Sequence, residues 1–416
     1  MTTEPFDRRL STWLERDAPG RVPDHLAEVL VATRATRQRP AWSSLERWLP
    51  VDLTLKPIPF LPGRPARLAL VIALLLVAAA AFYLVAGALR PRVPAPFGPA
   101  RNGLVVYESG GDVMTLDPAT GRTTTIVGGI ESDIAPRVSR DGTKILFVRA
   151  HPGAKYQLMV AGLDGSGTRP LGGPIDRLDP ADYASWSPDG TRVAVDTDMD
   201  GHVAVRIFAL DGTVTAAFPH DDGSLTPAVG WVQWRPDGQG LVLQAWYPPV
   251  FGIWTVRVDG SGKRQILPGS GIDRELSSPA LSPDGTTIAF AFLDDGQMRL
   301  VDSNTGADQG VTFPGGAGDD HKPAWSPDGS RLAFERAADG TAHIVVAPAT
   351  GGIAVTTGPS FDPDQVPTFA FSPDGSRIIA WFPRDSSTWL LDPAGGAGQR
   401  MSFDAEQLAV WQRLAP

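Results

Sequence analysis

A short turn motif recurs six times along the C-terminal three quarters of the chain, and it constrains the fold more than any other feature. Most copies read Ser-Pro-Asp-Gly, and their Asp residues lie 44 to 48 positions apart. Proline presets the first turn position, Asp bonds nearby backbone, and Gly adopts the left-handed conformation, so each copy predicts a β-hairpin. The copies span residues 139–142, 187–190, 235–238, 282–285, 326–329 and 372–375.

A second marker, a strand that ends in an acidic turn, occurs about 23 residues after each hairpin and numbers seven in all. The first repeat lacks its inner strand, whereas the C-terminal segment 408–411 matches the inner-strand segment 322–325 and has no hairpin of its own. The C-terminal strand is therefore expected to complete the first blade and to remove the open sheet edges. These repeats predict an all-β chain with a seven-bladed β-propeller, with six blades as the alternative.

One uncharged apolar stretch precedes the repeats. No charged residue occurs from Leu68 to Leu89, and arginines flank the stretch on both sides. About 20 apolar residues cross a bilayer as a helix, and this stretch begins too far into the chain for a cleaved signal peptide. The sequence thus predicts a transmembrane helix at 67–89, the alternative being a buried helix in a globular core.

Charge is distributed unevenly about this stretch. Residues 1–67 carry 11 Lys and Arg against 8 Asp and Glu, whereas residues 90–416 carry 26 against 38. The basic N-terminal part predicts a single-pass protein of the bacterial cytoplasmic membrane with a cytoplasmic N-terminus and an extracytoplasmic propeller. The acidic C-terminal part argues against nucleic acid as a partner. The chain has no cysteine, which excludes disulfides, thiolate zinc sites and cysteine nucleophiles.

The chain is thus expected to have four parts. Apolar residues at helical spacing in 4–18 and 24–38 predict a small α-helical segment before the apolar stretch. The predicted parts are a cytoplasmic helical segment at 1–66, a transmembrane helix at 67–89, a Pro-rich linker at 90–100 and the propeller at 101–416.

The repeats resemble those of TolB-like propellers, which are related to WD repeats. The resemblance rests on a Trp-Ser-Pro-Asp-Gly hairpin followed by a strand that ends in Ala-Phe, and it covers about residues 101–414. It implies a protein that binds other proteins or serves as a scaffold. The N-terminal layout is similar to that of bacterial anti-sigma factors, without the zinc-binding His and Cys of many of them. That similarity implies a sigma factor as the cytoplasmic partner of residues 1–66, the alternative being an amphipathic segment with no specific partner.

Calcium is the one cofactor that the sequence suggests. Asp196, Asp198 and Asp200, followed by Gly201, repeat the spacing of a calcium-binding loop. The twelfth position is Ile207 instead of the bidentate Glu, and an ordinary hairpin is expected at this place in a blade. No other cofactor is expected.

Charged residues also precede the inner strand of most repeats. In a propeller these positions gather at one mouth of the central channel, where converging carboxylates attract a cation or a basic ligand. The alternative is that they are solvated loop residues. The candidate ligand-binding residues are Asp133, Asp182, Glu275, Asp320, His321, Lys322, Asp364 and Glu406.

No pattern in the sequence indicates catalysis. The Gly-Ser-Gly runs lack the flanks of a nucleophile elbow, and the six His residues show no metal-ligand spacing. The chain is expected to be a membrane-tethered sensor or scaffold that binds a protein or ligand outside the cytoplasm and regulates a cytoplasmic partner, not an enzyme. The alternatives are a propeller enzyme, such as a lyase or glycan hydrolase, and a passive envelope interaction module.

Overall fold

The structure is a computed structural model, and its chain divides into two compact units, Met1–Arg90 and Pro91–Pro416. The described residues are 75–77, 95, 97–151, 155–176, 184–199, 202–219, 229–245, 251–268, 276, 279–292, 295–314, 318–365 and 367–415.

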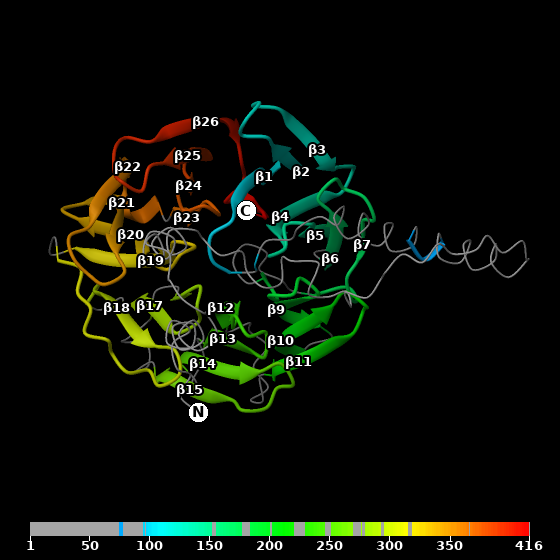
Figure 1. Ribbon diagram of the computed structural model, residues 1–416, viewed down its shortest axis with the longest axis horizontal. Coiled ribbons are helices and arrows are strands. Elements are labelled where there is room, and N and C mark those ends of the chain that lie inside the picture. Colours follow the sequence, from blue (N-terminus) through cyan, green and yellow to red (C-terminus); the bar gives the residue numbers. More distant parts are fainter. Residues whose placement is uncertain are drawn as a thin grey trace, which may run out of the picture. The chain divides into compact units, whose positions relative to one another are not determined.

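The second unit is a ring of seven antiparallel sheets, each a blade (Figure 1). Blades 1 to 4 have four strands each, which run in the following order from the innermost strand outward. Blade 1 comprises β27 (Val410–Leu414), β1 (Arg101–Ser109), β2 (Asp112–Leu116) and β3 (Thr123–Val127), and blade 2 comprises β4 (Ser132–Val138), β5 (Lys144–His151), β6 (Lys155–Gly162) and β7 (Arg169–Pro170). Blade 3 comprises β8 (Ala184–Trp186), β9 (Arg192–Met199), β10 (His202–Ala209) and β11 (Val214–Pro219), and blade 4 comprises β12 (Val229–Trp234), β13 (Gly240–Ala245), β14 (Gly252–Arg257) and β15 (Arg264–Pro268).

Blades 5 to 7 complete the ring, and blade 5 has three strands in the described part of the chain. Blade 5 comprises β16 (Ala280–Leu281), β17 (Thr287–Ala291) and β18 (Met298–Asp302). Blade 6 comprises β19 (Asp319–Trp325), β20 (Arg331–Ala338), β21 (Thr341–Pro348) and β22 (Val355–Phe361), and blade 7 comprises β23 (Thr368–Phe371), β24 (Ile378–Phe382), β25 (Ser387–Leu391) and β26 (Gln399–Asp404). A short 3₁₀ helix, η4 (Pro363–Gln365), joins blades 6 and 7. The prediction of an all-β, seven-bladed propeller is confirmed, and the six-bladed alternative is wrong.

The two ends of the propeller sequence meet in blade 1. Strand β27 pairs antiparallel with β1, and Val106 lies opposite Val410. Across the next boundary, Gln412 Nε2 donates to the carbonyl oxygen of Gly142 at 2.9 Å. Gly142 has φ 70°, and a Cβ there would lie 2.0 Å from the carbonyl oxygen of Arg413, so only glycine fits. The C-terminal strand therefore closes blade 1 and also contacts blade 2.

The repeated turn is held by its own side chains. In blade 6, Ser326 Oγ donates to Asp328 Oδ1 at 2.6 Å, and the backbone nitrogen of Arg331 donates to Ser326 Oγ at 2.9 Å. Burial acts to raise the pKa of Asp328, but the hydrogen bonds from Ser326 and Ser330 outweigh it and lower the pKa. The motif thus fixes the hairpin by local chemistry, as its sequence predicts.

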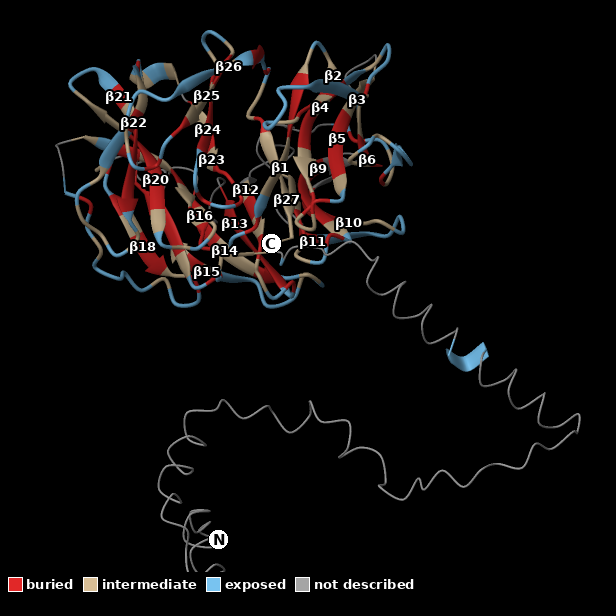
Figure 2. Ribbon diagram, turned by 45° about the horizontal axis from the view of Figure 1, so that its top comes forward, coloured by how far each residue is buried: buried red, intermediate tan, exposed pale blue. Residues whose placement is uncertain are grey.

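Tryptophans that precede the motif join three pairs of neighbouring blades. Trp234 Nε1 donates to the carbonyl oxygen of Ser185 in blade 3 at 2.9 Å, and Trp325 Nε1 donates to that of Ala280 in blade 5 at 3.0 Å. Buried side chains lie along the strands throughout the ring (Figure 2). The ring is therefore held by apolar packing within and between blades and by these repeated inter-blade hydrogen bonds.

The predicted membrane span falls almost wholly outside the described residues. Residues 75–77 are helical and exposed. Among the residues that the structure describes, no helix has the length and apolar character needed to span a bilayer. The predicted helices of segment 1–66 also lie outside the described residues, so the anchor and the cytoplasmic segment stay predictions.

Candidate functional site

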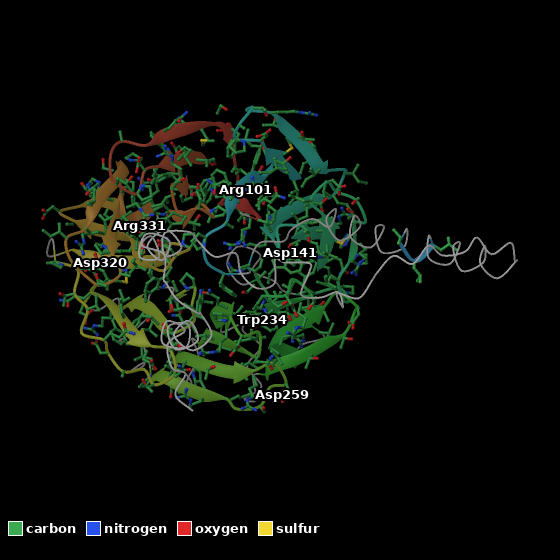
Figure 3. The ribbon with its side chains drawn as sticks, viewed as in Figure 1. Arg101, Asp141, Trp234, Asp259, Asp320 and Arg331 are labelled. Carbon is green, nitrogen blue, oxygen red and sulfur yellow. The ribbon has the colours of Figure 1, made fainter. Side chains whose placement is uncertain are left out.

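The direction of the innermost strands defines two ends of the central channel. Apart from β27, each of these strands runs from an inter-blade loop to the repeated hairpin turn. The loops therefore gather at one end, which we call the loop end, and the turns at the other, the hairpin end. At about 3.3 Å per residue, a strand of the length of β4 separates these ends by roughly 20 Å. In Figure 3, Trp234 lies nearer the centre of the ring and Asp259 lies at its periphery.

Two of the predicted loop-end carboxylates are occupied by arginines of their own blades. Asp133 accepts two hydrogen bonds from Arg149, at 2.7 and 2.9 Å, and Asp320 accepts two from Arg336 at the same distances. Both Asp residues are buried. Each pair joins neighbouring strands, β4 to β5 and β19 to β20. These carboxylates therefore stabilise their blades and are not open acceptors for a ligand.

The predicted His321 and Lys322 follow Asp320 on β19. The backbone of Lys322 adopts φ 51° at a shift in strand register, and its Nζ donates to the carbonyl oxygen of Pro367 at 3.0 Å. Burial lowers the pKa of His321 in spite of the opposing effect of Asp319 and Asp320. Burial thus favours the neutral form of His321, and Lys322 joins blade 6 to blade 7.

The remaining predicted residues differ in exposure. Asp364 in η4 and Glu406 before β27 are exposed, and Glu406 Oε1 accepts a hydrogen bond from the backbone nitrogen of Gly110 at 2.8 Å. Asp182 and Glu275 lie outside the described residues. The described groups lie at the loop end as expected, and the ligand-binding mouth itself stays a prediction.

Glu108 is a loop-end carboxylate that the sequence reasoning missed. It ends an apolar run in β1, and its Oε2 accepts a hydrogen bond from the backbone nitrogen of Ala135 in blade 2 at 2.9 Å. Burial raises the pKa of Glu108 to about 7 against the effect of that hydrogen bond, and the nearby Glu406 adds to the increase. A lone acid in an apolar strand was the available signal. Glu108 is therefore partly protonated near neutral pH.

Two of the three candidate calcium ligands lie on a regular strand. Asp196 and Asp198 belong to β9, opposite Val205 and Val203 of β10, and Asp200 lies outside the described residues. Within the described ranges, no three His, Cys, Asp or Glu side chains are placed to hold a metal ion together. Calcium binding stays a prediction.

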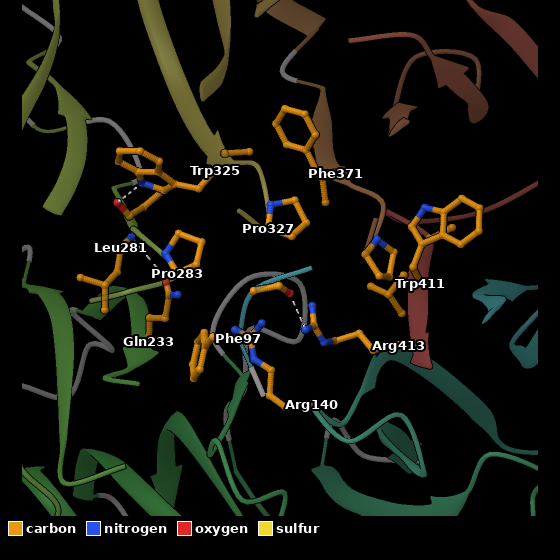
Figure 4. A pocket seen from close by; sticks show the side chains of 17 residues that line it. Phe97, Arg140, Gln233, Leu281, Pro283, Trp325, Pro327, Phe371, Trp411 and Arg413 are labelled. Atoms are coloured by element: carbon orange, nitrogen blue, oxygen red, sulfur yellow. Dashed lines mark hydrogen bonds between the residues drawn. The ribbon is translucent and has the colours of Figure 1, made fainter. Parts of the chain in front are cut away.

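The hairpin end holds a pocket that the sequence reasoning did not single out. It is a cavity of about 310 Å³ lined by aromatic and proline side chains of the inner strands and turns, together with two arginines, Arg140 and Arg413 (Figure 4). Phe97, from the segment before β1, also lines it, and the Arg140 guanidinium lies 4.8 Å from the centre of the Phe97 ring.

Comparison with known families identifies a propeller family. Residues 142–391 match the family model described as the TolB β-propeller domain. A protein TolB homolog of Chlorobium luteolum is 30% identical over 167 residues, which are 40% of this chain and 35% of that protein. The match thus spans about a third of the length of this relative.

Solved structures share the fold at low sequence identity. A functionally unknown protein from Desulfotomaculum acetoxidans has a TM-score of 0.54 at 9% identity, over 75% of this chain and 99% of that one. The periplasmic gluconolactonase of Pseudomonas aeruginosa has a TM-score of 0.52 at 16% identity, over 76% of this chain and 99% of that one. At these identities the similarity shows the propeller fold alone.

Proposed function

Because this chain belongs to the TolB β-propeller family, we propose that its propeller is a protein-binding module of the cell envelope. The proposal places the partner at the loop end of the channel. It includes the function of a tethered sensor or scaffold, in which the propeller binds outside the cytoplasm and the N-terminal segment binds inside.

The observation that carries the proposal is a fully exposed apolar side chain at the same end of the channel as several exposed acids. Ile130 is fully exposed in the loop between β3 and β4. Asp319, Asp364 and Glu406 are exposed in or beside other inter-blade loops. An apolar anchor on the same face as acidic groups suits a protein partner with an apolar pocket and a basic rim, since burial supplies affinity and charge supplies orientation.

Binding is proposed in preference to catalysis because Asp320 is already paired with Arg336. An enzyme built on Asp320 and His321 would need a free Asp320 carboxylate, and both Asp320 oxygens accept hydrogen bonds from Arg336. The similarity of this chain to the gluconolactonase is a similarity of fold alone.

The support for a membrane anchor comes from the sequence. The uncharged stretch at 68–89 supports a membrane anchor, and the basic character of residues 1–67 supports a cytoplasmic N-terminus. In this arrangement residues 1–66 engage a cytoplasmic regulator, with a sigma factor as the first candidate.

The test is affinity capture with the full-length chain from whole-cell extract, followed by binding of each purified candidate. Ile130→Asp is expected to abolish binding of the envelope partner, because a charge replaces the apolar anchor. The matched control is Ile353→Asp, since Ile353 is also exposed but lies between β21 and β22 at the hairpin end. This control should bind as the wild type does.

Two further arms of the same experiment test the tether. Deleting 1–66 should abolish binding of the cytoplasmic regulator and spare the envelope partner, and deleting 67–89 should release the protein from the membrane fraction. Equal binding by wild type and Ile130→Asp would contradict the docking face. Recovery in the soluble fraction before any deletion would contradict the anchor.

A further inference from the structure

The first position after the motif serine points to an unusual feature at the hairpin end. Five blades have proline there, at Pro188, Pro236, Pro283, Pro327 and Pro373. Blade 2 has Arg140, and in blade 1 the closing strand has Arg413, which follows Trp411 as Pro327 follows Trp325. Proline is the residue that this turn favours, so turn chemistry does not explain Arg140.

These two arginines converge on the same pocket. Arg140, Arg413 and three of the prolines line it together, and Figure 4 shows both arginines pointing toward the space beside Phe97. Burial, together with the like charge of Arg413, lowers the pKa of Arg140 to about 10, so both stay charged at neutral pH. Two like charges are thus held close in a partly apolar cavity.

No acidic side chain among the described residues compensates this charge. In the part of the chain that the structure describes, neither Arg140 nor Arg413 forms an ion pair. Two buried donors beside the pocket, Arg413 Nε and Trp411 Nε1, also lack a hydrogen-bond partner within the described ranges. Uncompensated charge and unpaired donors are costly when buried, and an anion would offset both costs.

The protein's own chain shows which chemistry fits. Arg413 Nη2 donates to the carbonyl oxygens of Ala95 at 3.0 Å and Gly98 at 2.7 Å, while the Phe97 ring lies against Arg140. The pocket therefore already holds a peptide segment through its carbonyl oxygens and an aromatic side chain. A carboxylate in place of a carbonyl would accept stronger, charge-assisted hydrogen bonds.

We propose that the hairpin end of the channel is a binding site for the C-terminal carboxylate of a peptide that ends in an aromatic residue, and that Phe97 and Gly98 of the segment before β1 cover this site. Arg140 and Arg413 hold the carboxylate, and the terminal ring packs where Phe97 lies, near Trp325 and the turn prolines. The cavity, at about 310 Å³, is within the size range of small-ligand pockets. This site is independent of the docking face proposed at the loop end.

The test is isothermal titration of the full-length chain in detergent with acetyl-Ala-Ala-Phe, as the free carboxylate and as the C-terminal amide. The carboxylate should bind saturably, and the amide at least about tenfold more weakly, because it lacks the charge that the arginines recognise. Phe97→Ala should bind the carboxylate more tightly than the wild type does, because the covering segment then competes less well.

The decisive variant is Arg140→Pro, which gives blade 2 the residue that five other blades have. It should keep the thermal unfolding midpoint and weaken carboxylate binding about tenfold or more. The control is Lys144→Gln, which removes a cation from the same hairpin outside the pocket and should bind as the wild type does. Equal binding of carboxylate and amide, undiminished binding by Arg140→Pro, or no binding even by Phe97→Ala would overturn the proposal.

Discussion

Deletion of residues 405–416 is expected to unfold the whole propeller and not merely to remove one strand. The deletion removes β27 and so exposes the edge of β1 and the apolar face beneath it. It also removes the fully buried Ala405 and Ala409 and the Gln412 hydrogen bond to blade 2. These losses sum to several kcal/mol, which is comparable with the whole free energy of unfolding of an ordinary domain.

Near-ultraviolet circular dichroism and thermal unfolding measure this effect. The deleted chain should lose its near-ultraviolet signal and its cooperative transition. Deletion of 1–66 is the control, because that segment belongs to the other compact unit, and it should leave the transition of the propeller in place. A cooperative transition within a few degrees of the wild type after loss of 405–416 would contradict the closure.

Replacement of Arg336 by alanine is expected to cost about 3–5 kcal/mol in the free energy of unfolding, because it leaves the buried Asp320 carboxylate without its partner. The side chains of Arg336 and Asp320 are only 11% and 6% exposed. The carbonyl oxygen of Phe313 also loses its hydrogen-bond donor. Urea unfolding followed by intrinsic fluorescence measures the change.

The matched control for this variant is Arg384→Ala. Arg384 pairs with Asp362 at a similar distance, but the two side chains are 60% and 44% exposed. Exposed ion pairs contribute little, so this change should stay within about 1 kcal/mol. Equal costs for the two variants would show that burial of the Asp320 pair is not what stabilises blade 6.

The repeated hairpin made most of the fold predictable because its chemistry is local. A serine such as Ser326 and an aspartate such as Asp328 act within five residues of each other, so six copies in one sequence define six turns. The seventh blade followed from counting, because the inner-strand pattern at 408–411 had no hairpin of its own. The pairing of β27 with β1 confirms that reading.

The candidate site was less predictable because its contacts join distant residues. Asp133 and Asp320 have the same sequence context as a solvated loop acid, and only the register of the next strand brings Arg149 and Arg336 to them. Glu108 acquires its raised pKa from burial between two blades. Such effects depend on packing, which periodicity and spacing do not report.

The hairpin-end pocket was less predictable from the sequence than the fold and more predictable than the loop-end contacts. The departure of Arg140 from the proline of the motif was visible in the sequence, but its meaning depended on Arg413, which comes from the opposite end of the propeller sequence. Closure of the ring brings the two together, and it also brings Phe97 against them. The pocket therefore exists only if the two ends of the propeller sequence pair through β1 and β27.

A disulfide between β1 and β27 is the most direct test of the closed ring. The chain has no cysteine, so Arg101→Cys with Leu414→Cys creates one possible bond, between residues that face each other across β1 and β27. Mild oxidation should cross-link this pair in the folded protein, as seen by mass spectrometry, and should not cross-link Arg101→Cys with Arg400→Cys on β26 of blade 7. Failure of the first pair to form, or equal formation of both, would contradict the closed seven-bladed ring.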